Sequence, residues 1–379
     1  MRRLLVIALL IPAALGFAQT LVVTVKNPAK FNRSHETVAV RLSDVTEALG
    51  QVDPSRLQVL REGERATRAI QLTEADLLFQ ADIAAGGTQR FVVSHAAAKE
   101  VPHPSLVSGL FVLPRQDYAW ENDRIAFRMY GPALAAEVNN GIDVWTKRVR
   151  YPIVGKWYKE ADASAPGKDS YHQDRGEGAD FFSVGRTLGA GGSGLWREGK
   201  VVQPGVFTSW KTLANGPIRI SFMLTYTWFL DGDSLKEEKT FSLDAGENLN
   251  RIEVRFSGGG KREGMQIACG LVKRAGTTAT QDRKNCILSL WGAVNDDPVN
   301  GTLGTAVVIP RGHCSDLTED KDQYLMIGDP RPGTPFVYYA GAGWTGNGGF
   351  SAGKDWTAYL DRFVERMAAP LQISTRGGK

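Results

Sequence analysis

The residues best suited to chemistry gather in one glycine-rich stretch, 167–194. Its ionisable members include His172, Asp174, Arg175, Glu177, Asp180 and Arg186. Long loops with this many charges and this much backbone freedom are often functional, although a solvated, salt-bridged turn is the alternative. If residues 171–174 are extended, His172 and Asp174 share one face. A carboxylate beside an imidazole orients the ring and raises its basicity, which suits a general base or acid.

A second group combines aromatic and basic side chains. It occupies residues 145–148, 156–159 and 338–349. Aromatic rings bind the apolar faces of sugars, and Arg or Lys binds carboxylates. Trp157 and Trp344 lie in polar, glycine-bearing segments, so they are candidates for a binding surface, whereas Trp228 and Trp291 are expected in the core.

Two further features carry weaker signals. Arg124, Arg128 and Tyr130 alternate with apolar residues, so a strand would place them on one face. That face could line an anionic groove, but we expect it to be the solvated face of a sheet. His313 lies where a strand pattern breaks into a loop, and it is the second histidine that we expect in a site.

The sequence indicates no cofactor. The glycines of residues 189–194 match the spacing of a dinucleotide fingerprint, but no helix pattern follows them and no acidic residue stands about 20 positions later. Five side chains could together bind a metal but lack compact ligand spacing: His172, Asp174, Glu177, His313 and Asp316. We expect no metal, with a divalent cation left as a minority alternative.

Strands must position these groups. Runs rich in Val, Ile, Thr and aromatic residues recur at 21–25, 37–42, 77–81, 91–94, 125–130, 218–230, 235–243 and 249–256. Asn-Gly and Asp-Gly dipeptides between runs favour tight turns. The pattern predicts an all-β sandwich or barrel. One helix is expected, over 355–367, and we expect it to cover the sandwich without taking part in chemistry.

The chain divides into three parts. Residues 1–18 have a basic start, an apolar run and small residues before a cleavage point, the pattern of a signal peptide. The run is too short to span a membrane comfortably, so we expect a periplasmic or secreted protein. Prolines near 97–105 separate a small N-terminal β-domain, 19–100, from a larger β-domain, 106–379.

The net charge and the cysteine spacing limit which binding partners and metal sites are possible. The net charge of +4 excludes a strongly basic nucleic-acid-binding protein, although a local basic groove could still bind a polyanion. Cys269, Cys286 and Cys314 lack the paired spacing of a zinc site. A disulfide between Cys269 and Cys286 and buried free thiols both stay open.

Longer motifs resemble a known family. Residues 120–131, 141–145 and 339–345, and above all Tyr-His-Gln-Asp-Arg-Gly-Glu-Gly at 171–178, resemble an exported bacterial family labelled only as a domain of unknown function, family 4861. The resemblance implies a large antiparallel β-supersandwich of the galactose-mutarotase-like kind, with the small N-terminal β-domain and the C-terminal helix attached. It also implies polysaccharide breakdown, with elimination chemistry on uronic-acid oligosaccharides.

Elimination from a uronate fits the residues present. A base removes the acidic C5 proton, a cation neutralises the carboxylate, and an acid assists the leaving oxygen at C4. A glycosyl leaving group makes the enzyme a lyase and a hydroxyl makes it a dehydratase. We expect His172 as base or acid, oriented by Asp174, with Tyr171 as the alternate proton carrier. Arg175 or Lys156 would bind the carboxylate.

Further residues are expected to line the substrate. They are Trp157, Tyr158, Glu177, Arg186, His313 and Trp344. The substrate would be an anionic oligosaccharide or polysaccharide, and we expect no nucleic-acid partner and no membrane once the signal peptide is removed. Three alternatives remain: a glycoside hydrolase using two of Asp174, Glu177 and Asp180, a non-catalytic carbohydrate-binding protein, and a mutarotase.

Overall fold

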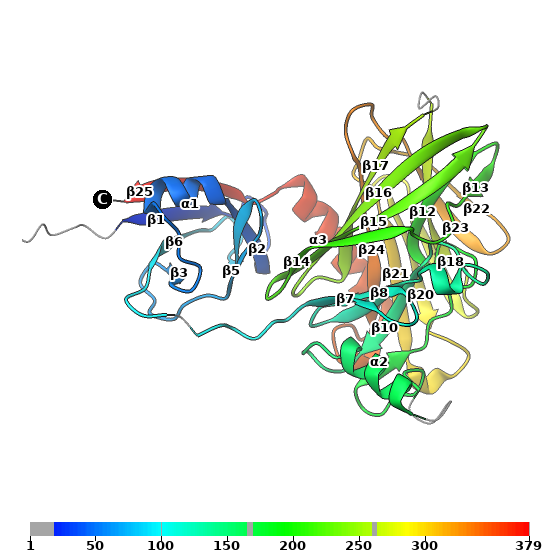
Figure 1. Ribbon diagram of the computed structural model, residues 1–379, viewed down its shortest axis with the longest axis horizontal. Coiled ribbons are helices and arrows are strands. Elements are labelled where there is room, and N and C mark those ends of the chain that lie inside the picture. The colour runs from blue at the N-terminus through cyan, green and yellow to red at the C-terminus, as the bar shows by residue number, and fades with distance from the viewer. Residues whose placement is uncertain (1–18, 100, 165–169, 260–263, 379) are drawn as a thin grey trace, which may run out of the picture.

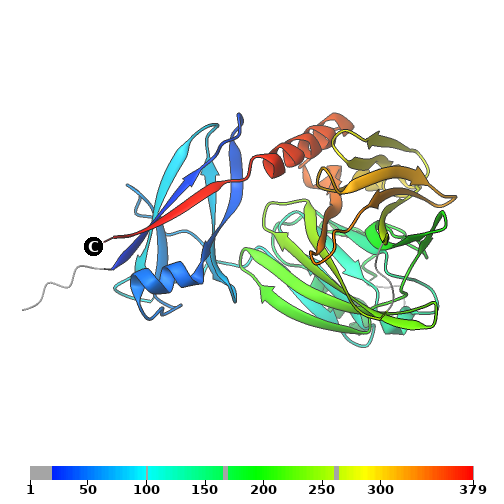
Figure 2. The ribbon, with the colours of Figure 1, turned by 90° about the horizontal axis from the view of Figure 1, so that it is seen from above.

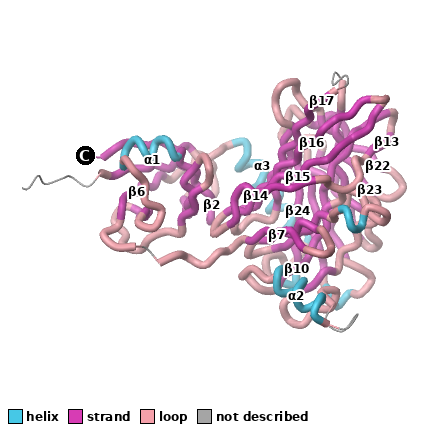
Figure 3. The backbone as a smooth tube through the Cα atoms, viewed as in Figure 1, coloured by secondary structure: helices cyan, strands magenta, loops and turns pink. Residues whose placement is uncertain are grey.

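The computed structural model describes residues 19–99, 101–164, 170–259 and 264–378. Most of its regular structure is antiparallel strand, in five sheets (Figure 1, Figure 3). The predicted all-β class is therefore confirmed. The predicted signal peptide, 1–18, lies outside the described residues. Among the helices of the described residues, none combines the length and the apolar character needed to cross a membrane.

The small domain holds two sheets. One has the order β25-β1-β6-β3 and the other β2-β5-β4. The strands are β1 (Thr20–Lys26), β2 (Arg33–Arg41), β3 (Leu57–Arg61), β4 (Ile70–Leu72), β5 (Asp76–Ile83), β6 (Thr88–His95) and β25 (Gln372–Gly378), with helix α1 (Leu42–Leu49) after β2. Side chains that alternate along these strands, such as Val23, Val38 and Phe91, fill the core between the sheets.

The chain returns to this domain at its C-terminus. Strand β25 pairs along its whole length with β1, from Thr20 opposite Gly378 to Lys26 opposite Gln372. Figure 2 shows α3 (Gly353–Ala368) leading from the larger domain to β25. The predicted extent of the larger domain, 106–379, is therefore wrong at its C-terminal end. Because β1 and β25 are about as far apart in sequence as two strands can be, no local pattern signals their pairing.

The larger domain packs an eight-stranded sheet against two five-stranded sheets (Figure 1). The first five-stranded sheet contains β7 (Ser108–Val112), β8 (Asp117–Glu121), β9 (Ile125–Met129), β10 (Ile142–Lys147) and β11 (Gly178–Asp180). The second contains β12 (Ala190–Arg197), β13 (Lys200–Val202), β18 (Gln266–Val272), β22 (Cys314–Glu319) and β23 (Gln323–Gly328). The eight-stranded sheet contains β14 (Ser209–Asn215), β15 (Arg219–Leu230), β16 (Asp233–Asp244), β17 (Leu249–Gly258), β19 (Thr277–Asp282), β20 (Ile287–Ala293), β21 (Thr302–Val308) and β24 (Phe336–Trp344).

Turn chemistry fixes the longest hairpin of this sheet. Strands β15 and β16 are joined by two residues, Asp231 and Gly232, with φ angles of 54° and 87°. Two consecutive positive φ angles are what a tight hairpin turn requires, and an Asp-Gly pair adopts them readily. The apolar residues of the hairpin, including Phe222 and Phe241, then face the sandwich core. The predicted strands 218–230 and 235–243 are confirmed.

The helices were only partly predicted. The predicted helix over 355–367 is α3, which packs on the eight-stranded sheet through Trp356, Leu360 and Phe363. Neither α1 nor α2 (Val154–Ala163) is among the predicted helices, and α2 contains Trp157, which is expected in a polar segment, and its neighbour Tyr158. The signal was present, because Val154, Trp157 and Tyr158 have the spacing of one apolar helix face.

The cysteines are free thiols. Cys269 lies on β18 and Cys286 immediately precedes β20, in different sheets, so no cross-strand disulfide joins them. Burial raises the pKa of the Cys269 thiol, which keeps it protonated and unreactive. The alternative of buried free thiols is the one that the structure bears out.

Candidate active site

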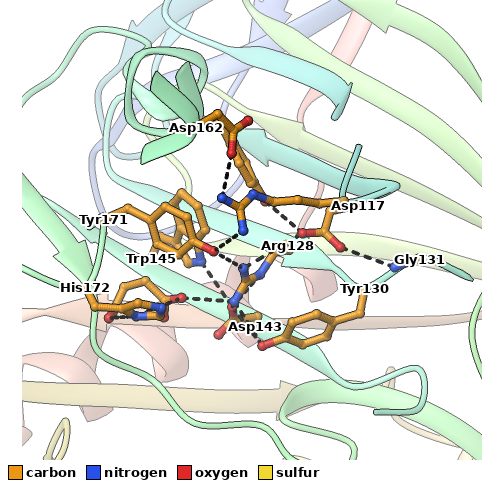
Figure 4. A network of polar contacts seen from close by, with 12 residues as sticks. Asp117, Arg128, Tyr130, Gly131, Asp143, Trp145, Asp162, Tyr171 and His172 are labelled. Atoms are coloured by element: carbon orange, nitrogen blue, oxygen red, sulfur yellow. Dashed lines mark hydrogen bonds and ion pairs between the residues drawn. The ribbon is translucent and has the colours of Figure 1, made fainter. Parts of the chain in front are cut away.

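Arg128 lies at the centre of a buried polar network on the first five-stranded sheet (Figure 4). Its Nε donates to Asp143 Oδ2 at 2.9 Å and its Nη2 to Asp180 Oδ2 at 2.9 Å, while Asp117 Oδ2 lies 3.8 Å from Nη1. The sheet register explains the cluster, since Asp143 is directly opposite Arg128 on the neighbouring strand. One guanidinium thus serves three carboxylates.

This finding corrects the prediction that Arg128 points to solvent. The residue is only 5% exposed. The Trp145 ring lies 5.0 Å from its guanidinium carbon, and the Tyr171 hydroxyl accepts a hydrogen bond from Nη1 at 3.4 Å. Helix α2 adds Tyr158, which donates to Asp117 at 3.2 Å. Segments that are distant in sequence therefore cover a face that strand alternation alone would leave exposed.

A buried carboxylate fixes the start of α2. Glu121 Oε1 accepts the backbone N–H groups of Ile153 and Val154 at 2.8 and 2.9 Å, and its Oε2 lies 2.5 Å from the buried Lys147 ammonium. A carboxylate at this position satisfies N–H groups that have no partner within the helix. Glu121 therefore positions the helix that closes the network.

The excess of negative charge shifts the protonation equilibria. Burial raises the pKa of Asp180 well above its ordinary value, and the nearby Asp143 carboxylate adds to the effect, which Arg128 opposes. Burial also raises the pKa of Asp117. Because one cation cannot neutralise three carboxylates, the network tends to keep a proton, and Asp180 is the group whose pKa favours this most clearly.

His172 connects this network to solvent. Its Nδ1 lies 3.0 Å from the backbone oxygen of Asp180 and 3.5 Å from Asp180 Oδ2, and the side chain is 58% exposed. A carbonyl oxygen only accepts hydrogen bonds, so the neutral ring carries its proton on Nδ1. Nε2 then has the lone pair, which is the arrangement of a general base.

The prediction that Asp174 is the partner of His172 is wrong. Residues 171–174 form a turn rather than an extended segment, with Gln173 N donating to Ser170 O at 3.2 Å. The expected shared face of His172 and Asp174 therefore does not exist. Asp180, eight residues further along the chain, takes the place expected for Asp174.

Asp174 instead organises the turn. Its carboxylate accepts hydrogen bonds from Gly176 N and Gly178 N at 2.8 and 3.0 Å and from Arg148 Nε at 2.6 Å. Partial burial alone would raise the pKa of Asp174, but these hydrogen bonds and the Arg148 charge outweigh it and lower the pKa. Asp174 is therefore a stably ionised structural anchor.

Arg148 links the turn to a second glycine-rich loop. Its Nη1 donates to Gly346 O at 2.9 Å, and its guanidinium carbon lies 4.7 Å from the centre of the Trp344 ring. Arg148 thus joins the two segments that the sequence singled out, around 171–178 and 344–349. Trp344 itself is fully buried, so the prediction that its ring is a binding surface is wrong.

Tyr171 lies between the network and the exposed ring of His172. Its hydroxyl accepts hydrogen bonds from Arg115 Nη1 at 3.3 Å and from Arg128, and its ring stacks on Trp145 with centroids 4.6 Å apart. The Tyr171 and His172 rings are 4.7 Å apart, centroid to centroid. The two proton carriers expected from the sequence are therefore adjacent.

Other predicted site residues are distributed unevenly. Lys156 on α2 binds both carboxylate oxygens of Glu177 at 2.8 Å, at the rim of the turn. Trp157 and Tyr158 are buried beneath it, because they form the inner face of α2. Their expected exposure to substrate is therefore wrong. Arg175 lines a small hollow in the same turn, next to Trp157 and Glu177.

Two predicted residues lie elsewhere. Arg186 binds the backbone oxygen of Ala136, and it lines a separate surface depression with Lys273 and Lys321. His313 belongs to a turn before β22, at the edge of the second five-stranded sheet, where its backbone oxygen accepts from Asp329 N at 2.8 Å. Neither is a member of the Arg128 network.

Sequence reasoning missed most of the network. Arg115, Asp117 and Asp143 were not singled out, Arg128 and Tyr130 were expected on a solvated face, and Trp145 was grouped with the aromatic and basic residues of 145–148. A usable signal was the set of charged residues that three successive short strands carry among apolar ones: Asp117 and Glu121 on β8, Arg128 on β9, and Asp143 and Lys147 on β10. In the part of the chain that the structure describes, no group of three His, Cys, Asp or Glu side chains is placed to hold a metal ion, and the cation among the three carboxylates is Arg128.

A family model and a known protein each match most of the chain. The family model described as a domain of unknown function, DUF4861, matches residues 25–373. The chain is 31% identical to uncharacterized protein P7 of Formosa agariphila over 381 residues, which covers 93% of this chain and 92% of that protein.

A solved structure shares the fold. It is titled as a protein in glycosyl hydrolase family 38 from Enterococcus faecalis, with a TM-score of 0.50 and 9% identity. The match covers 94% of this chain and 47% of that one, so this chain spans about half the length of that protein. At such low identity the likeness concerns the fold alone.

Proposed function

The chain belongs to the family described as a domain of unknown function, DUF4861, and on that premise we propose that it is a carbohydrate-active enzyme. Its substrates would be oligosaccharides that contain uronic acid, and its reaction β-elimination to a 4,5-unsaturated uronate. The shared fold with a chain titled as a glycosyl hydrolase supports testing carbohydrates first. Residues 1–18 have a signal-peptide pattern, so we also propose that the enzyme acts in the periplasm or after secretion.

The observation that carries the proposal is the state of His172. The ring is exposed and donates from Nδ1 to the Asp180 backbone, which leaves the Nε2 lone pair free to accept a proton from a bound substrate. When the ring takes up that proton, the Arg128 network can stabilise the positive charge, because its three acidic groups outnumber its guanidinium even when one of them is protonated, and Asp180 Oδ2 lies 3.5 Å from Nδ1. His172 is therefore the proposed base that removes the C5 proton.

The rim of the site suits an anionic sugar. Arg148 and Lys156 provide cationic groups whose side chains are 36% and 49% exposed. They are paired with Asp174 and Glu177, so a bound uronate would share these cations with the two carboxylates. Arg175 lies in the same turn. A cation that binds the uronate carboxylate stabilises the negative charge that develops when the C5 proton leaves. Tyr171, next to His172, is the proposed acid for the leaving oxygen at C4.

A hydrolase using two of Asp174, Glu177 and Asp180 is supported less well. Asp174 is bound to Arg148 and two backbone N–H groups, and Glu177 is bound to Lys156. Asp180 is only 3% exposed. A glycosidase needs two carboxyl groups on either side of the bond that is cleaved, and these three are occupied with internal partners.

The test is to incubate the protein with a panel of uronic-acid oligosaccharides and to record ultraviolet absorbance and product mass. New absorbance with loss of one water indicates a dehydratase, and new absorbance with shorter chains indicates a lyase. We expect His172→Ala to lower kcat/KM at least about a hundredfold. His313→Ala, at the edge of another sheet, is the matched control and should leave the rate unchanged. Shorter chains without absorbance, or full activity of His172→Ala, would contradict the proposal.

A further inference from the structure

A cleft separates the two domains on the outer face of the eight-stranded sheet. Its volume is about 500 Å³, and it is lined by β2, by the last turns of α3 and by outward-facing residues of β16, β17 and β24. Sites for small molecules commonly have volumes of about 300–1,000 Å³. Its lining residues belong to the eight-stranded sheet, to α3 and to the small domain, and not to the turn that holds His172.

Ion pairs form one side of the cleft. Arg366 on α3 binds Glu36 of the small domain at 3.0 Å and Glu247 of the larger domain at 2.6 Å. Arg33 binds Glu36 at 3.0 Å, and its side chain is only 5% exposed. Within the described residues, the buried Arg33 Nε has no hydrogen-bond partner. A buried donor without a partner is unfavourable unless solvent or a ligand in the cleft satisfies it.

The eight-stranded sheet contributes a guanidinium and an aromatic ring to the lining. Arg251 on β17 is 43% exposed at the side chain and pairs with Glu253, which lies outside the lining and is also 3.6 Å from Arg255. Tyr339, on the neighbouring strand β24, packs edge-on against Phe363 with ring centroids 5.0 Å apart. The register places Arg251 directly opposite Tyr339, so the two side chains are neighbours on the same face.

The charges of the lining favour an anion. Four arginines line the cleft, and three carboxylates face them. Their identities are Arg33, Arg219, Arg251 and Arg366, with Glu36, Asp244 and Glu247. Arg219 and Asp244 are paired by two hydrogen bonds of 2.6 and 2.8 Å, and Arg366 is paired with Glu247. Arg251 differs from the other three, because its partner Glu253 lies outside the lining and also pairs with Arg255.

We propose that this cleft is a second binding site, which accepts one carboxylated sugar unit. Arg251 binds the carboxylate, and the half-buried Tyr339 ring supports the apolar face of the sugar. The choice of a uronate as ligand rests on the proposed function, whereas the preference for an anion rests on the lining alone. A uronate released or held by the first site would be retained on the same molecule.

Titration calorimetry with glucuronate, and with glucose as the neutral probe, tests the proposal on the whole chain. We expect Arg251→Gln to bind glucuronate about tenfold more weakly at one site, as removal of one charged hydrogen bond predicts, and Arg251→Lys to recover part of the loss. Arg255→Gln is the matched control, because Arg255 shares Glu253 but does not line the cleft. Equal losses in Arg251→Gln and Arg255→Gln, or equal binding of glucose, would overturn the proposal.

The two proposals can fail separately. His172→Ala should keep the Arg251-dependent binding, and Arg251→Gln should keep elimination activity on short soluble substrates. If no unsaturated product is ever formed but Arg251→Gln still loses glucuronate binding, the cleft proposal stands and the elimination proposal fails. If elimination occurs but glucuronate binding never depends on Arg251, the cleft proposal fails alone.

Discussion

Two buried arginine networks in this chain are alike in composition and differ in charge balance. In the larger domain, the single guanidinium of Arg128 faces three carboxylates. Between the domains, Arg33 and Arg366 face Glu36 and Glu247, two cations with two anions. A balanced network can stay fully ionised, whereas an unbalanced one favours retention of a proton.

The pKa shifts follow this difference. Burial raises the pKa of Asp180, and Arg128 does not compensate for it. Burial would also raise the pKa of Glu247, but the charge of Arg366 and its hydrogen bonds outweigh burial and lower that pKa. The balanced network is suited to fastening two domains together. The unbalanced one, which ends at an exposed imidazole, is suited to moving protons.

The largest expected effect is that of Arg128→Met. Removal of the guanidinium that faces Asp117, Asp143 and Asp180 leaves these three buried carboxylates without that partner, so the free energy of unfolding at pH 7 should fall by about 3–5 kcal/mol. The pKa values of Asp117 and Asp180 are higher in the folded state than in the unfolded state. Their contribution to folding stability is therefore complete below the unfolded-state pKa, and it is lost as the pH rises through the folded-state pKa. Urea unfolding should therefore show a smaller loss near about pH 4 than at pH 7. A loss that does not change with pH would contradict the unbalanced charge assignment.

Glu247→Gln should respond to pH in the opposite direction. The folded pKa of Glu247 is lowered, so its contribution is present above the unfolded pKa and is lost as pH falls through the folded value. We expect a loss of about 2 kcal/mol in the free energy of unfolding at pH 7, typical of hydrogen bonds to a charged group, and a smaller loss at acidic pH. Glu62→Gln, which breaks an exposed pair with Arg90 at 3.9 Å, is the control and should change stability by less than about 0.5 kcal/mol. An equal loss at both pH values would remove the distinction between the networks.

Local patterns predicted the framework that carries these networks. Runs of alternating apolar residues gave the strands, the Asp231-Gly232 pair gave the turn of the longest hairpin, and helical spacing gave α3. Each of these features depends on residues that are close in sequence, so the sequence contains the signal directly.

The parts that escaped prediction depend on distant segments. Arg128 is buried because α2 and the turn around Tyr171 pack over its strand. The alternation of residues along one strand does not indicate whether a distant segment will pack on its face. The pairing of β1 with β25 joins the two ends of the chain. His172 was predicted as the proton carrier from its chemistry, but its partner was misassigned, because the identity of that partner depends on whether 171–174 is a strand or a turn.

The smallest expected effect decides between the two possible partners of His172. Asp174→Asn keeps one oxygen acceptor for the turn and loses only the charge that faces Arg148. The free energy of unfolding should therefore fall by about 0.5–1 kcal/mol. If Asp174 oriented the imidazole, its loss would favour the wrong tautomer, which can lower kcat by up to about 10⁴-fold. Nδ1 faces the Asp180 backbone oxygen, and the Asp180 carboxyl lies 3.5 Å away. We therefore expect Asp174→Asn to lower kcat less than about tenfold. Asp180→Asn keeps the backbone oxygen but removes the acidic group beside the protonated ring, so it should lower kcat more. Steady-state rates of both variants, at substrate saturation and with melting curves recorded in parallel, make the comparison. The reverse order of effects would show that the unbalanced network stabilises the fold without orienting the proposed base.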